Sequence, residues 1–313
     1  MKLLSKVLAV FLALCCITFT ATACNEIIIA ESGLVYEVSE DGQFAMVKGY
    51  KGAIVDVVVE ETFEGVPVQL INGSAFAHCE TLKSVVIPQS VSIISEHAFR
   101  NCTALTSVEI PDSVIAIARG AFYGCTALEQ ITLPNQIDMI SFSVFYGCTA
   151  LKSVKIPSSV INVMESAFYG CLSLQTVDLG EGLERIGQNA FFGCVSLKDI
   201  AFPSTLTEID NYAFDDCLSL EKLVLPESLE FLGSRVFDGC NNLVLYSEAT
   251  EKPVEWRPIN YLKNPVYWYS ETEPEINEEG NKYLGNFWRY ENDEPTIWDK
   301  PDTDFVEDEF NKN

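Results

Sequence analysis

The chain has 313 residues, with 20 basic side chains against 45 acidic ones, and a formal net charge of −25 at pH 7. Such a surface repels the phosphates of nucleic acids and the anionic head groups of lipids, so neither is an expected partner. The length alone would suggest two domains, but an internal repeat overrides it, because a solenoid grows by adding rungs. We therefore predict one elongated body.

Residues 1–23 have the pattern of an export signal peptide. They contain no acidic residue, carry Lys2 and Lys6, and run apolar from Val7 to Phe19 before the small residues Ala21-Thr22-Ala23. The apolar run is too short to span a membrane comfortably. We expect this segment to direct export and to be removed.

Cys24 follows the predicted signal directly. Ala21-Thr22-Ala23-Cys24 resembles a relaxed bacterial lipobox, in which the cysteine is lipidated and becomes the first residue, although Leu is more usual at the position of Ala21. The resemblance implies a cell-surface protein anchored to the membrane by acyl chains on Cys24. The alternative is a plain signal peptidase cut after Ala23 and a fully secreted protein.

Residues 24–73 are predicted to form a β-rich N-terminal cap with a partial repeat. Leu34–Val38 and Ala53–Val59 alternate or run β-branched, as strands do, and Asp41-Gly42 and Lys51-Gly52 are turn signals.

Residues 74–248 form a strict repeat. Cysteines recur every 23 residues, each with Phe three residues before and Leu three residues after. The repeat cysteines are Cys79, Cys102, Cys125, Cys148, Cys171, Cys194, Cys217 and Cys240. The segment that follows each cysteine, Leu-x-x-Val-x-Ile and usually Pro, predicts a short strand with one buried face that ends at the proline.

The full unit reads C-x-x-L-x-x-V-x-I-P-x-S-V-x-x-I-x-x-x-A-F-x-G and resembles the BspA-like leucine-rich repeats of bacterial surface proteins. The resemblance implies a leucine-rich-repeat solenoid, with a curved parallel β-sheet and short helical or irregular turns on the other side. It also implies a surface-exposed interaction protein, since family members are associated with adhesion to host or microbial partners. It transfers no particular ligand.

After Cys240 the repeat decays. Residues 249–298 are rich in Trp and Tyr, and we predict an aromatic C-terminal cap that covers the last open rung. Residues 299–313 are acid-rich with few core formers, and we predict a disordered tail.

The repeat cysteines are predicted to form a ladder of buried thiols. Adjacent rungs about 4.8 Å apart fall within disulfide reach, but copies in register point the same way. One thiolate per rung also does not make a tetrahedral metal site, so no metal is expected.

The outward strand positions are the first candidates for partner binding, because they vary over a fixed backbone. The candidate residues are Ser107, Glu109, Gln130, Thr132, Ser153, Lys155, Thr176 and Asp178. The partner expected is an extracellular protein or glycan, although a merely solvated face has the same pattern.

A second candidate is an aromatic column. Tyr123, Tyr146, Tyr169 and Phe192 occupy the same position in four consecutive repeats. The column could stack on sugar rings or receive apolar side chains of a partner; the alternative is that the rings pack on one another.

No catalytic or cofactor site is predicted. His78 and His97 lie at different phases of the repeat without a motif that supplies a nucleophile, and are expected to be exposed. Asp215, Asp216 and Asp238, with Glu208 and Asp210, are expected to form a solvated acidic patch.

The sequence therefore predicts a non-catalytic surface binding or adhesion protein, with a structural envelope-associated scaffold as the alternative.

Overall fold

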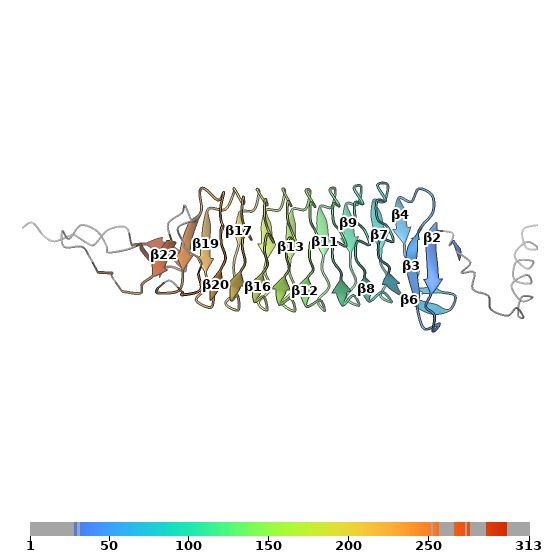
Figure 1. Ribbon diagram of the computed structural model, residues 1–313, viewed down its shortest axis with the longest axis horizontal. Helices are drawn as coiled ribbons and strands as arrows, with labels where there is room; N and C mark the ends of the chain where they lie inside the picture. Colours follow the sequence, from blue (N-terminus) through green and yellow to red (C-terminus); the bar gives the residue numbers. More distant parts are fainter. Residues whose placement is uncertain are drawn as a thin grey trace, which may run out of the picture.

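The computed structural model describes residues 28–29, 32–251, 253–256, 266–272, 274–275 and 286–298. These residues form an elongated solenoid whose strands stack along the long axis (Figure 1). The described residues contain strands and irregular turns but no helix, and thus no helix able to cross a bilayer. The predicted export signal, Cys24 and the acidic tail lie outside the described residues.

The N-terminal end is built from strands that differ from the repeat. β2 (Leu34–Val38) and β3 (Ala45–Tyr50) form an antiparallel hairpin, and β1 (Ile28–Ile29) pairs with β2. β3 then pairs in parallel with β6 (Val66–Ile71), which also pairs with β5 (Thr62–Phe63). The hairpin therefore covers the first rung of the solenoid.

One side of the solenoid is a row of short parallel strands, one per rung. The row consists of β4 (Asp56–Val58), β7 (Ser84–Val86), β9 (Ser107–Glu109), β11 (Gln130–Thr132), β13 (Ser153–Lys155), β15 (Thr176–Asp178), β17 (Asp199–Ile200), β19 (Lys222–Leu225) and β21 (Val244–Ser247). From β7 to β11 and from β13 to β17 the pairing shifts by one 23-residue repeat, as in Ser84 with Ser107. We call the outward surface of this row the strand face.

A second row of parallel strands lies on the side of the solenoid opposite the first row. Short helical or irregular turns were expected on this side from the sequence. Besides β6, the second row contains β8 (Ile93–Ile94), β10 (Ala116–Ile117), β12 (Met139–Ile140), β14 (Asn162–Val163), β16 (Arg185–Ile186), β18 (Glu208–Ile209) and β20 (Phe231–Leu232). A helix is about 10 Å wide, whereas neighbouring strands lie about 4.8 Å apart. Because both sides have strand spacing, the body in Figure 1 runs nearly straight.

Each repeat contains an Ala-Phe segment, which is residues 166–170 in one of them. Backbone hydrogen bonds that all point the same way join this segment to its copy in the next rung. The N–H groups of Ser166, Phe168 and Gly170 donate to carbonyls of the following rung at 2.9, 2.8 and 2.8 Å. Seven consecutive junctions repeat this set of three bonds at 2.7 to 3.1 Å. Ser166 (φ 58°) and Gly170 (φ 68°) lie in the left-handed region, which turns alternate N–H groups towards the same neighbour.

The interior is a set of identical side chains stacked in columns. The Phe168 ring lies 5.3 Å from the Phe145 ring and 5.1 Å from the Phe191 ring, centroid to centroid. The Cys171 thiol donates to the Phe145 carbonyl, with Sγ and O 3.2 Å apart, and six other repeat cysteines make the equivalent contact.

All eight repeat cysteines are free and buried, which confirms the predicted thiol ladder. Burial raises the pKa of the seven thiols from Cys102 to Cys240, for Cys125 and Cys194 to about 12. These seven thiols therefore stay protonated, and a protonated thiol is neither a good nucleophile nor a good metal ligand.

Aromatic residues close the C-terminal end. β22 (Val266–Tyr269) and β23 (Phe287–Glu291) continue the first row in parallel, and β24 (Glu294–Ile297) pairs antiparallel with β23. Trp288 is fully buried, and its Nε1–H donates to the Ser247 carbonyl at 2.8 Å.

Replacing a central Phe should weaken the whole stack, because the gap interrupts the column on both sides. We expect Phe168→Ala to lower the free energy of unfolding by about 3 to 5 kcal/mol. Denaturant melts measure this loss. The exposed Thr176→Ala, whose hydroxyl has no hydrogen-bond partner among the described residues, serves as control and should change stability by less than about 0.5 kcal/mol. Equal melts for the two variants would contradict the assigned core.

Candidate functional site

The structure places all eight predicted strand residues on the strand face. In β9, β11, β13 and β15 the middle residue is buried and both flanking residues are exposed. Val154, for example, is 3% exposed, whereas Ser153 and Lys155 on either side face solvent. Parallel pairing in register then aligns the exposed residues in two rows along the body.

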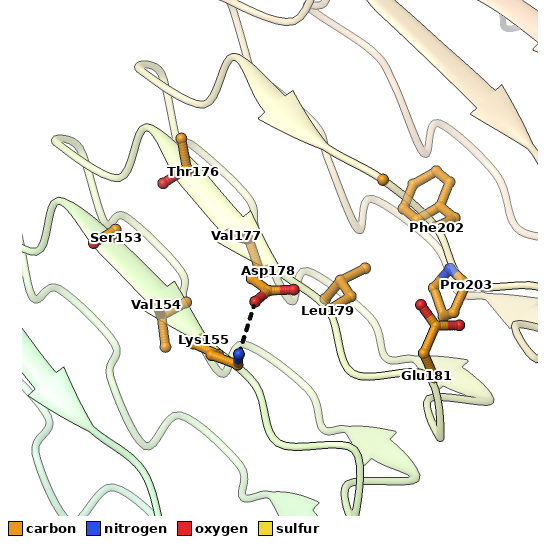
Figure 2. Close-up of a pocket in the computed structure, with 11 residues that line it drawn as sticks. Ser153, Val154, Lys155, Thr176, Val177, Asp178, Leu179, Glu181, Phe202 and Pro203 are labelled. Atoms are coloured by element: carbon orange, nitrogen blue, oxygen red, sulfur yellow. Dashed lines mark ion pairs between the residues drawn. The ribbon is translucent and has the colours of Figure 1, made fainter. Parts of the chain in front are cut away.

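Three depressions open on this face, one after another along the body. The first lies over β7, β9 and β11, and is lined by Ser84, Val86, Gln89, Glu109, Asp112, Thr132 and Asn135 among others. The second lies over β13, β15 and β17, and Figure 2 shows the side chains that line it. Short side chains such as Ser153, Thr176 and Ala201 form the floor, and Glu181 and Pro203 come from the segments that follow the strands.

The third depression has a wall that the sequence analysis did not predict. Its floor comes from β17 and β19, and the β23–β24 hairpin contributes Tyr290, Asp293 and Glu294. Lys222 Nζ lies 2.5 Å from Glu294 Oε2, which ties the hairpin to the strand face. The turn residues Asn292 and Asp293 are both left-handed, as in a two-residue hairpin loop. In the sequence, Asn292-Asp293 separates a segment rich in aromatic residues from one that contains β-branched residues, and this pattern could have predicted the hairpin.

Ion pairs on the strand face are few and solvent-exposed. Lys155 Nζ lies 3.5 Å from Asp178 Oδ2, and their side chains are 82% and 64% exposed (Figure 2). At such exposure a pair contributes little stability. Glu248 Oε1 accepts a hydrogen bond from the Tyr290 hydroxyl at 2.7 Å, and Asp112 Oδ1 accepts from the backbone and side chain of Asn135.

The aromatic column lies apart from these depressions, and its rings stack on one another. Centroids of Tyr123, Tyr146, Tyr169 and Phe192 are 4.6, 4.6 and 4.7 Å apart, with planes within 5°. The Arg100 guanidinium lies over the Tyr123 ring at 5.0 Å. Both faces of Tyr146 and Tyr169 are therefore covered, so a sugar ring finds ring edges and hydroxyl groups there instead of open ring faces.

The two histidines differ in exposure. His78 is exposed, as predicted, and its Nδ1 lies 3.4 Å from Asn101 Nδ2. His97 is half-buried, contrary to prediction, because it packs against Gly120 of the next rung; its Nδ1 has no hydrogen-bond partner among the described residues. In the described part of the chain, no group of three or more metal-ligating side chains comes together.

The predicted acidic patch separates into two parts. Glu208 and Asp210 lie beside the second row of strands, where they pair with Arg185 at 3.1 and 3.4 Å. Asp215 belongs instead to the Ala-Phe segment. Burial, with smaller contributions from the charges of Asp216 and Asp238, raises the pKa of Asp215 to about 6.

This raised pKa predicts a pH-dependent stability. Folding favours the protonated form of Asp215. The stabilisation that this group gives to the folded protein is therefore fully present below pH 3.8 and is lost as the pH rises through about 6. We expect Asp215→Asn to raise the free energy of unfolding at pH 7 by about 1 kcal/mol, allowing for solvent screening of this partly exposed group. Denaturant melts at pH 4 and pH 7 test this; an equal effect at both would contradict it.

Comparison with known proteins identifies the repeat. The family model for the BspA type leucine rich repeat region matches in six copies over residues 69–180 and 115–244. No curated protein sequence matches the chain.

Solved structures of other repeat proteins are similar. The T. pallidum leucine rich repeat protein is 30% identical, with 61% of this chain and 89% of that chain covered and a TM-score of 0.58. A leucine rich cell surface protein from Faecalibacterium prausnitzii is 29% identical, with 64% and 60% covered and a TM-score of 0.44. With a family match that spans more than half of its residues, the chain belongs to the BspA-type leucine-rich repeat family.

Proposed function

We propose that this protein is a non-catalytic binding protein of the bacterial cell surface, and that its strand face recognises an extracellular protein or glycan. The observation that carries the proposal is that the exposed strand residues differ from rung to rung while the backbone beneath them is the same. Variation over a constant frame is how repeat proteins adapt a surface to one partner.

The three depressions support the strand face as the binding surface. They open side by side on the same row of strands, and together they extend from β7 to the C-terminal hairpin. Among the described residues, their linings include no His, the side chain that most often serves as a general acid or base. A long, open face suits a macromolecule better than a small substrate, which usually occupies an enclosed pocket.

A bulky charge on the strand face should abolish binding without unfolding the protein. We expect Thr176→Arg to lose any partner found by screening the protein against matrix proteins and glycan arrays. Thr207→Arg, an exposed threonine beside the second row of strands, should bind as the unchanged protein does. Thermal melts check that both variants fold. Equal binding by the two would reject the strand face, and a silent screen would favour a structural scaffold.

Export and a lipid anchor belong to the same proposal and are supported by the sequence of residues 1–24. We expect cells given radiolabelled palmitate to label the protein, and Cys24→Ala to abolish the label. Label retained in the Cys24→Ala variant would place the lipid elsewhere. No label in either form would favour plain signal peptidase cleavage and secretion.

A further inference from the structure

We propose that the strand face binds an extended polypeptide segment that carries Lys or Arg side chains, a proposal that rests on the function proposed above. The reason is a charge imbalance along the three depressions. Their linings contain eight carboxylates, Glu109, Asp112, Asp178, Glu181, Glu221, Glu248, Asp293 and Glu294. They contain three lysines, Lys155, Lys198 and Lys222.

The lysines do not neutralise this face. Lys155 is already paired with Asp178, and Lys222 with Glu294, which leaves one lysine, Lys198, against the other six carboxylates. In each depression at least one carboxylate has no ion pair with another described residue: Glu109 in the first, Glu181 in the second, and Glu221 and Asp293 in the third. Each depression can therefore accept a cationic side chain beside its unpaired carboxylate.

The spacing of these carboxylates fits an extended chain that runs along the body. Glu109 and Glu181 lie three rungs apart, which is about 14 Å along the body at strand spacing. Within its rung Glu181 lies three residues beyond the position that corresponds to Glu109, after the end of β15. An extended polypeptide advances about 3.4 Å per residue, and alternate side chains point the same way. Two basic residues four positions apart would therefore cover the distance of about 14 Å along the body, and their long, flexible side chains would cover the sideways offset between Glu109 and Glu181.

A polypeptide fits this face better than a glycan for two reasons. Common glycans are neutral or anionic, whereas Lys and Arg give a polypeptide positive charge. In addition, the outward residues of β7 to β15 include no aromatic ring for a sugar to stack on, and the aromatic residues that line the depressions, Phe202 and Tyr290, lie only towards the C-terminal end. The covered faces of the tyrosine column do not supply one either.

The test measures binding of a fluorescein-labelled peptide of six Lys-Ser repeats to the full chain by fluorescence anisotropy. We expect saturable binding that weakens as salt rises from 50 to 500 mM, because salt screens exposed charges. A peptide of six Glu-Ser repeats should not bind. Chitosan hexamer, a cationic oligosaccharide, should compete poorly; tighter binding of chitosan than of the peptide would overturn the choice of a polypeptide.

A matched pair of double variants separates a local site from general attraction to an acidic protein. Glu109→Gln with Glu181→Gln changes the strand face, and Glu184→Gln with Glu230→Gln removes the same charge from exposed positions beside the second row of strands. We expect the first pair to weaken peptide binding about tenfold and the second less than about twofold. Equal weakening, or none in either, would overturn the proposal.

The two proposals fail differently. If a natural partner binds and Thr176→Arg abolishes that binding, but the Glu109/Glu181 double variant and salt have no effect, the strand face is the site and the partner is not basic. If Thr176→Arg leaves the binding of every partner and of the Lys-Ser peptide unchanged, the strand face itself is rejected.

Discussion

Hydrogen bonding between rungs is the interaction on which the rest of this structure depends. No rung has its own core, so each one is stable only when its Phe, Leu and Cys side chains contact the copies above and below. The three N–H groups of each Ala-Phe segment, all directed to the next rung, hold this corner at the same spacing as the two rows of strands. Left-handed residues at both ends of the segment make that direction possible.

The same constraint explains the cysteines. At their position a small buried side chain must sit beside the Phe carbonyl of the preceding rung, and the thiol fills the space while donating to that carbonyl. Protonated thiols held in this way have a packing role, which is why the most conspicuous residues of the repeat take no part in the proposed function. Function falls to residues that the stacking leaves free, on the outside of the strands.

Two rows of strands, in place of strands backed by helices, also shape the binding surface. With strand spacing on both sides, the body stays nearly straight, and a partner would lie along the strand face. The C-terminal hairpin ends that face, since Tyr290, Asp293 and Glu294 form the far wall of the third depression. An extended segment with positive charges suits this shape and this charge.

The sequence by itself determined the 23-residue period, the buried columns, the free thiols and the exposure of Ser107, Lys155 and their counterparts. These features follow from local alternation and repetition, so neighbouring residues specify them. Tertiary structure alone decided that Lys222 meets Glu294, that Glu208 and Asp215 lie apart, and that the faces of Tyr146 are covered. These outcomes depend on the orientation of individual rings and on contacts between segments far apart in the sequence, and the repeat pattern alone fixes neither.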